Sequence, residues 1–84
     1  MSNAMTPQST EGMRVLVQGR PYQLPADPNF RPFVKVPGSD LVHLGLVSTG
    51  HALCGVAMSY SMVKPDSRLC IKCQTGLRRM GLLA

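Results

Sequence analysis

All three cysteines and both histidines of this chain lie within one stretch, residues 43–73: HLGLVSTGHALCGVAMSYSMVKPDSRLCIKC. Cys70 and Cys73 are separated by two residues, and Cys54 lies sixteen residues before Cys70. Thiolates and imidazoles are the ligands that Zn²⁺ takes in four-coordinate structural sites. An odd number of cysteines does not suit a disulfide framework, in which cysteines pair. The stretch therefore predicts a zinc site.

The length of 84 residues predicts one small domain. Residues 1–4 (Met-Ser-Asn-Ala) read as the remnant of an expression tag, and the small, polar residues 5–12 are expected to be disordered. The remaining domain, 13–84, contains no tryptophan and only four aromatic residues. A hydrophobic core of this size typically supplies only ~3–5 kcal/mol. The fold therefore needs a further stabilising element, which a metal site can provide.

Short apolar runs separated by turn residues predict a small antiparallel sheet. Residues 21–32 contain four prolines, which exclude a helix and a central strand, so we expect an ordered loop or polyproline-like arm there. The strands are expected at 14–17, 33–36, 41–47 and 51–57, with the alternating apolar residues of 58–68 as a further strand.

The residues from Cys70 onward predict a short C-terminal helix that starts at the Cys-x-x-Cys motif. One expected face is apolar, at helical spacing: Cys73, Leu77, Met80 and Ala84. The side chains expected to point away from that face are Lys72, Gln74 and Arg79. Gly76 and Gly81 each weaken the helix by up to ~1 kcal/mol relative to alanine. The predicted class is α+β: a zinc-stabilised antiparallel sheet, zinc-ribbon or treble-clef-like, followed by this helix.

Cys70 and Cys73 form the first half of the predicted site. Two intervening residues allow a tight turn to aim both sulfurs at one point, and a helix N-terminus favours negative charge there. Thiol redox sites share this motif, but a third cysteine, Cys54, favours zinc. Gly55 follows Cys54, and a residue without a side chain lets the backbone fold around the sulfur.

The fourth ligand is His43 or His51. The spacing His51-x-x-Cys54 is that of a metal knuckle and favours His51. Strand pairing favours His43, because a hairpin with Ser48 and Thr49 at its tip places His43 opposite Cys54. Directly opposed side chains have Cβ atoms ~4.5–5.5 Å apart, which suits two ligands of one ion. In a regular strand, His51 would point to the other face.

Three segments resemble a pattern of small actinobacterial and actinophage zinc-finger proteins whose function is unassigned. The matching residues are Val42-His43-Leu44, Ala52-Leu53-Cys54-Gly55 and Leu69-Cys70-Ile71-Lys72-Cys73. The resemblance covers about residues 41–80 and implies zinc bound by His43, Cys54, Cys70 and Cys73. This chain departs from the pattern by carrying His51 just before Ala52, so His51 remains the alternative to His43.

The formal net charge is +5, and most of it lies in residues 64–84, with five basic residues and one acidic residue. A basic segment indicates an anionic partner such as nucleic acid, for which the candidate residues are Lys72, Arg78 and Arg79. The same cations could instead favour the thiolate form of the cysteines. Because the chain has few aromatics to stack on bases and no dense arginine stripe, we expect a protein partner rather than DNA or RNA.

The sequence predicts a cytoplasmic binding or regulatory module rather than an enzyme. A zinc ion with four protein ligands leaves no open position for a substrate, and four acidic residues offer little material for acid–base catalysis. Alternatives are a nucleic-acid-binding zinc finger and a thiol redox or zinc-release sensor in which Cys70 and Cys73 form a disulfide. No membrane association is expected, and an exposed sheet edge would allow two copies to pair.

Overall fold

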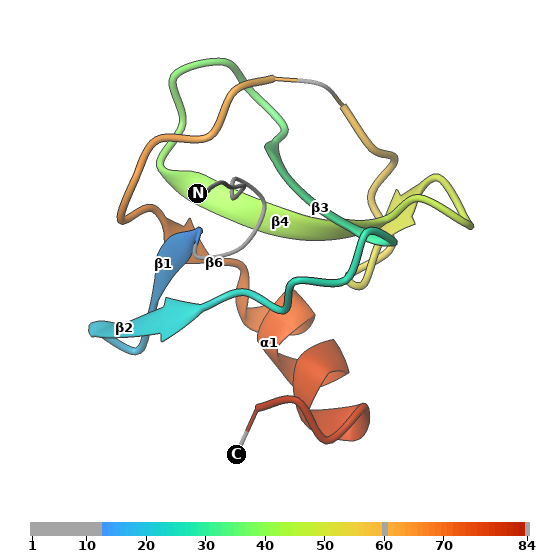
Figure 1. Ribbon diagram of the computed structural model, residues 1–84. Helices are drawn as coiled ribbons and strands as arrows, with labels where there is room; N and C mark the ends of the chain where they lie inside the picture. Colours follow the sequence, from blue (N-terminus) through green and yellow to red (C-terminus); the bar gives the residue numbers. More distant parts are fainter. Residues whose placement is uncertain (1–12, 60, 84) are drawn as a thin grey trace, which may run out of the picture.

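The computed structural model describes residues 13–59 and 61–83, so the predictions for residues 1–12 lie outside the described part. A sheet of short strands lies beside one C-terminal helix, which confirms the α+β class (Figure 1). The elements are β1 (Arg14–Val17), β2 (Arg20–Gln23), β3 (Phe30–Val34), β4 (Leu41–Leu46), β5 (His51–Ala52), β6 (Arg68–Leu69) and α1 (Ile71–Arg79).

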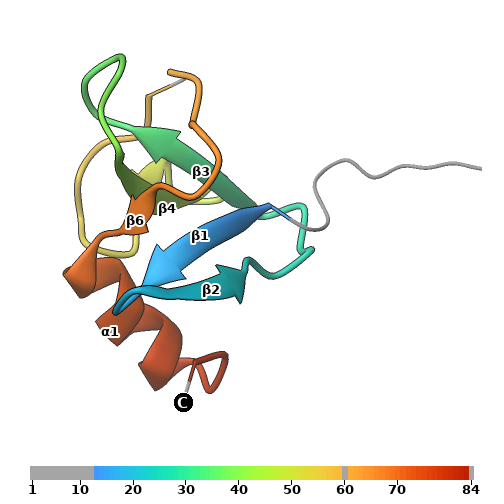
Figure 2. The ribbon, with the colours of Figure 1, turned by 90° about the vertical axis from the view of Figure 1, so that its left-hand side faces the viewer.

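The sheet is mixed, where the sequence predicts an antiparallel one. Its order is β2-β1-β6-β4-β3, with β5 paired to β4 (Figure 2). The two-residue strand β6 runs parallel to both neighbours, with Arg68 in register with Leu16 on β1 and Leu41 on β4. All other strand pairs are antiparallel. β6 thus joins the β1–β2 hairpin to the β3–β4–β5 unit, and no local pattern in the sequence signals this long-range pairing.

The proline-rich arm is shorter than predicted. Pro21 lies in β2 and Pro32 lies in β3, the strands at the two ends of the sheet order. An edge strand tolerates proline because one side of its backbone has no ladder partner to receive an N–H. The predicted loop at 21–32 therefore holds only between these strands, and the strand predicted at 33–36 is instead Phe30–Val34.

The strand predicted at 51–57 stops early, since β5 contains only His51 and Ala52. The chain then turns, and the Gly55 N–H donates to the Ala52 carbonyl with an N···O distance of 2.8 Å. Between this turn and β6, the described residues form only single bridges, including the bridge of Val34 with Ser61. The strand predicted at 58–68 is therefore reduced to these bridges and β6.

Strand β4 is buried along its middle, from Val42 to Gly45. It lies between β6 and β3, and because consecutive residues are buried, both of its faces are covered. Helix α1 contributes Cys73 and Leu77, both with no exposed surface. The largest apolar side chains at the centre are Phe33, Leu44, Leu77, Val15, Val34 and Val42.

Helix α1 differs from the predicted amphipathic pattern at Gln74. Cys73 and Leu77 are buried as predicted, and Met80, just past the helix, is half exposed. Gln74 is only 4% exposed, although its polarity suggests an outward position. Its Nε2 donates to the Leu69 carbonyl at 2.9 Å, so the amide is buried with a partner. This bond fixes the first turn of α1 against β6. Ala84, predicted on the apolar face, lies outside the described residues.

Gly76 allows α1 to approach the segment after β5. A Cβ added at this position would lie 2.9 Å from Leu53 Cβ, which is closer than such atoms pack. The glycine that weakens the isolated helix therefore permits the tertiary contact that stabilises it. Beyond the helix, the Tyr22 hydroxyl donates to the Leu82 carbonyl at 3.0 Å and ties the chain end to β2.

We predict that Gly76→Ala lowers the free energy of unfolding by ~1–3 kcal/mol, the usual cost of overpacking. Helix propensity alone would predict a gain of up to ~1 kcal/mol from this change. Urea unfolding followed by circular dichroism measures the difference, with Lys72→Ala on the exposed side of α1 as the control. A second change, Leu53→Gly, which removes the Cβ that the new methyl group would meet, should relieve part of the penalty, and a stabilised single variant would contradict the close packing.

Candidate metal centre

Cys54 is brought to His43 by the hairpin of β4 and β5. The paired residues are Gly45 with Ala52 and Leu46 with His51, and this register confirms the predicted one. The ladder does not extend as far as Cys54, which lies in the turn after Ala52. In that turn Gly55 has a positive φ of 99°, which favours glycine. The Cys54 Sγ lies 3.4 Å from the His43 Nδ1.

Cys70 is brought to His43 along the same edge of β4 by the parallel pairing of β4 and β6. Leu69 is in register with Val42, and the Cys70 N–H donates to the Val42 carbonyl at 2.8 Å. One step further along both strands, Cys70 lies beside His43. Cys70 is also the N-cap of α1, so Cys73 follows within the first helical turn.

These four side chains form one cluster. The ligand atoms of His43, Cys54, Cys70 and Cys73 all lie within 4.8 Å of one another. A tetrahedral ion with metal–sulfur bonds of about 2.3 Å and a metal–nitrogen bond of about 2.0–2.1 Å holds its ligands about 3.5–3.8 Å apart. The 3.4 Å separation of the Cys54 Sγ and the His43 Nδ1 is close to that spacing. The residues are therefore placed to hold a metal ion.

The cluster is buried at one end and reachable at the other. Cys73 has no exposed surface and His43 is 7% exposed, whereas Cys54 and Cys70 are half-buried. The ring of Phe33, opposite His43 in the β3–β4 register, packs against the imidazole with centroids 5.4 Å apart. The imidazole is therefore held in place by packing, while an ion could enter past the half-buried thiols.

A backbone donor points at the buried sulfur. The Leu44 N–H donates to the Cys73 Sγ at 3.4 Å. Such a bond favours the thiolate over the thiol, because it stabilises the negative charge. Leu44 therefore supports the site through its main chain, which no reading of side chains in the sequence could reveal.

The electrostatics of the unliganded cluster oppose thiolate formation. Burial, together with the nearby Cys54 and Cys70, raises the pKa of the Cys73 thiol to about 12, and the Leu44 N–H opposes the shift. Burial also lowers the pKa of His43, with a smaller contribution from the positive charge of Lys35. A neutral imidazole is the form that binds metal. A thiolate at Cys73, by contrast, needs a cation beside it.

The structure places the remaining predicted residues outside this cluster. His51 is exposed, and its Nδ1 lies 3.0 Å from the Thr49 carbonyl oxygen at the hairpin tip. The candidate nucleic-acid residues Lys72, Arg78 and Arg79 are exposed on α1. Of the two histidines, the structure therefore brings only His43 to the cysteines.

Comparison with protein-family models, with curated proteins and with solved structures finds no significant match for this chain. The resemblance to phage and actinobacterial zinc fingers therefore stays a prediction. Within the described residues, no helix is long and apolar enough to cross a membrane.

We predict that the affinity for zinc rises with pH by at least about tenfold per pH unit between about pH 6 and about pH 8. The ion must displace the proton held by Cys73, whose raised pKa keeps the thiol protonated throughout this range. His43 adds little to the slope, because its lowered pKa leaves the imidazole neutral. Competition with a chromophoric chelator at several pH values measures the slope. An affinity independent of pH would contradict the thiolate site.

Proposed function

We propose that this chain is a small structural-zinc module that binds a macromolecular partner. The observation that carries the proposal is the convergence of four ligand atoms, three sulfurs and one nitrogen, within 4.8 Å. Soft thiolate ligands favour zinc over magnesium, calcium or manganese, and a tetrahedral set of sulfur and imidazole ligands is typical of structural zinc sites.

A site with four protein ligands supports a structural role rather than a catalytic one. Catalytic zinc ions keep one coordination position for water or substrate, and four protein ligands fill that position. Two surface hollows of the described residues, with volumes of about 280 and 250 Å³, are also smaller than most sites for small molecules. A binding module therefore fits the geometry better than an enzyme.

The ion would hold together three segments that are weak by themselves. β5 and β6 have two residues each, and α1 has nine. Isolated helices shorter than ~12–15 residues are marginal in water. One ligand lies on β4, one after β5 and two at the start of α1, so a single ion would connect all of them. Zinc binding and folding are coupled in domains of this kind.

The surface favours a protein partner over nucleic acid. Proteins that bind single strands without sequence preference stack bases on aromatic side chains. Of the aromatic residues in the described part of the chain, Phe33 is fully buried and Phe30 is half-buried. Tyr22 is half-buried and uses its hydroxyl to bind the Leu82 carbonyl. A stacking platform is therefore lacking among the described residues.

We predict that His43→Ala weakens zinc binding by more than about 100-fold, beyond the ~10–100-fold loss typical when a residue that only supports a ligand is changed. The matched control is His51→Ala, which should leave the zinc content near one ion per chain because His51 lies outside the cluster. Elemental analysis of the purified proteins measures the content. In the wild type, a strong chelator should also abolish the circular dichroism signal of α1.

Two outcomes would contradict the proposed site. One is wild-type protein that is folded but carries no stoichiometric metal, with a disulfide between Cys70 and Cys73. The other is a larger loss of zinc in His51→Ala than in His43→Ala, which would favour the knuckle spacing over the observed cluster.

The second candidate function is nucleic-acid binding, because Lys72, Arg78 and Arg79 are exposed on one short helix. If nucleic acid is the partner, Arg78→Ala/Arg79→Ala should weaken binding to duplex DNA without loss of zinc. The log–log dependence on salt should then have a slope of about −0.9 per neutralised phosphate. A mobility-shift titration at two salt concentrations measures both. Under the protein-partner proposal, no salt-dependent binding is expected at micromolar protein.

A further inference from the structure

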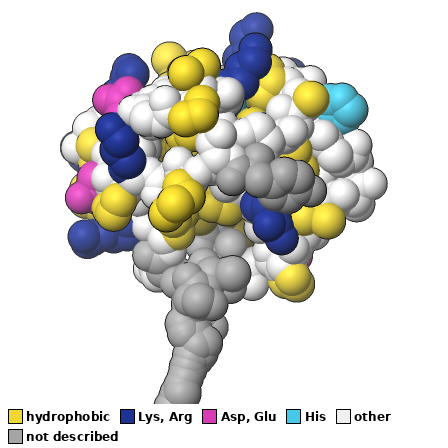
Figure 3. Space-filling model, turned by 90° about the horizontal axis from the view of Figure 1, so that it is seen from above, with side chains coloured by type: hydrophobic (Ala, Val, Ile, Leu, Met, Phe, Trp, Pro, Cys, Tyr) yellow, Lys and Arg dark blue, Asp and Glu magenta, His cyan; other side chains and the backbone are white. Residues whose placement is uncertain are grey.

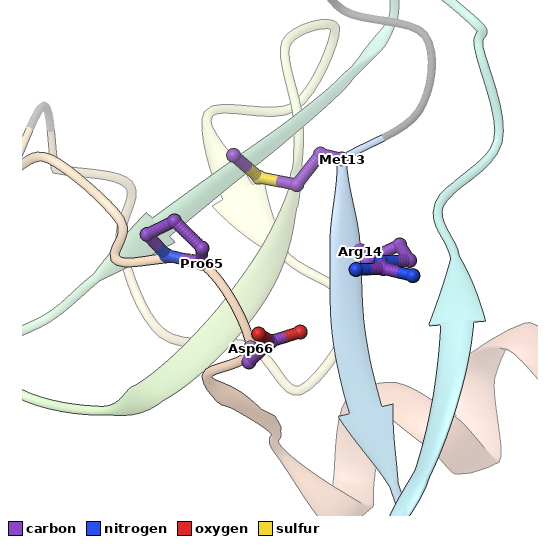
Figure 4. A pocket seen from close by; sticks show the side chains of 4 residues that line it. All are labelled: Met13, Arg14, Pro65 and Asp66. Carbon is purple, nitrogen blue, oxygen red and sulfur yellow. The ribbon is translucent and has the colours of Figure 1, made fainter.

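Two shallow hollows lie on the surface of the described residues. The first, of about 280 Å³, lies between the start of β1 and the turn before β6 and is lined by Met13, Arg14, Pro65 and Asp66 (Figure 4). The second, of about 250 Å³, lies where β1, β4 and β6 meet the first turn of α1. Pockets for small molecules and cofactors usually measure ~300–1,000 Å³. Both hollows are below that range and suit individual side chains.

The second hollow has an apolar lining built by the sheet register. Leu16, Arg68 and Leu41 are in register across β1, β6 and β4, so their side chains share one face. Leu69 and Ile71 also line the hollow. Ile71 is 74% exposed, which is unusual for an isoleucine and leaves an apolar wall open to a partner. We call this hollow, with these five residues, the β6 groove.

The cations around the β6 groove favour an anionic partner. Arg68 lines the groove, and Lys72 follows the lining residue Ile71 directly in the sequence. The described residues contain nine basic and three acidic side chains. Figure 3 shows the basic side chains spread over one face of the molecule, with the acidic ones on one flank of it. The described part of the chain is therefore strongly basic, and the charged residue in the lining of the groove is the cation Arg68.

Asp40 is the one carboxylate paired with a cation of the groove among the described residues. It lies 3.3 Å from the Arg68 Nη2, and both side chains are about two thirds exposed, at 66% and 64%. Exposed ion pairs of this kind are weak, because water and salt screen them. A carboxylate of a partner can therefore replace Asp40 at Arg68 at small cost.

We propose that the β6 groove binds an acidic peptide segment that inserts an aliphatic side chain between Leu16, Leu41 and Ile71 while a neighbouring carboxylate pairs with Arg68. The small volume favours a side chain over a cofactor, and the apolar walls favour an aliphatic one. Arg68, in a strongly basic chain, favours an acidic neighbour. Nucleic acid fits less well, since the groove has aliphatic walls and no aromatic side chain on which a base could stack.

This inference rests on the proposed metal centre, because the same residues position the groove. Leu69 and Ile71 flank the ligand Cys70, and the first turn of α1 carries Cys73. Gln74, which also lines the hollow, binds the Leu69 carbonyl and fixes α1 against β6. Peptide binding should consequently be lost when the ion is removed.

A display library of random peptides, selected on the full-length zinc-loaded protein, tests the proposal. Enriched peptides should combine Asp or Glu with Leu, Ile or Val. Fluorescence anisotropy should then show that Ile71→Ser and Arg68→Gln each weaken their binding by roughly tenfold or more, the loss expected at a central contact. The matched controls are Met62→Ser, at an apolar side chain 88% exposed outside the groove, and Lys64→Gln, at an exposed cation; both should keep the affinity within about twofold.

Several results would contradict binding of an acidic peptide in the β6 groove. They are enrichment of basic peptides, no enrichment at all, acidic peptides whose affinity neither groove variant changes, and duplex DNA or RNA binding that the groove variants abolish. Zinc content is measured on every protein, so that the two proposals fail separately. A zinc-loaded wild type that selects no acidic peptide refutes the groove alone, whereas a folded wild type without zinc refutes the metal centre.

Discussion

His43 lies on β4 between the turn that carries Cys54 and the strand end that carries Cys70, and this position links the hairpin, β6 and the helix. Antiparallel pairing with β5 sets one neighbour, and parallel pairing with β6 sets the other. Each of those strands has two residues, so neither ladder is strong by itself. An ion bound at this point would connect both ladders to α1, and the central strand would then hold the small sheet and the helix in one unit.

Much of this arrangement follows from local patterns in the sequence. The hairpin register could be predicted because Ser48 and Thr49 mark its tip, and the helix could be predicted from the spacing of Cys73 and Leu77. The strand lengths could not, because the turn at Gly55 and the edge positions of Pro21 and Pro32 depend on tertiary context. The parallel partners of β6 lie far away in sequence, at Leu16 and Leu41, and nothing near Arg68 indicates them.

The roles of the residues that support the site could not be predicted from the sequence. The polarity of Gln74 predicts a position on the exposed side of the helix. Its amide is instead buried, because the Leu69 carbonyl provides a hydrogen-bond partner. The Leu44 N–H that points at Cys73 is a main-chain group, so no side chain marks it. Gly76 lowers helix propensity, but the absence of a side chain there allows the helix to pack closely against Leu53. In each case a long-range contact decides the role of the residue, whereas periodicity reports only local structure.

One metal ion bound by three sulfurs and one nitrogen would hold β4, β5, β6 and α1 together. X-ray absorption spectroscopy at the zinc edge, on protein purified without added metal, determines this ligand set. We predict three sulfur ligands at about 2.3 Å and one nitrogen ligand at about 2.0–2.1 Å. Two or fewer sulfur ligands, or an oxygen ligand from water in the fourth position, would contradict a closed site formed by His43, Cys54, Cys70 and Cys73.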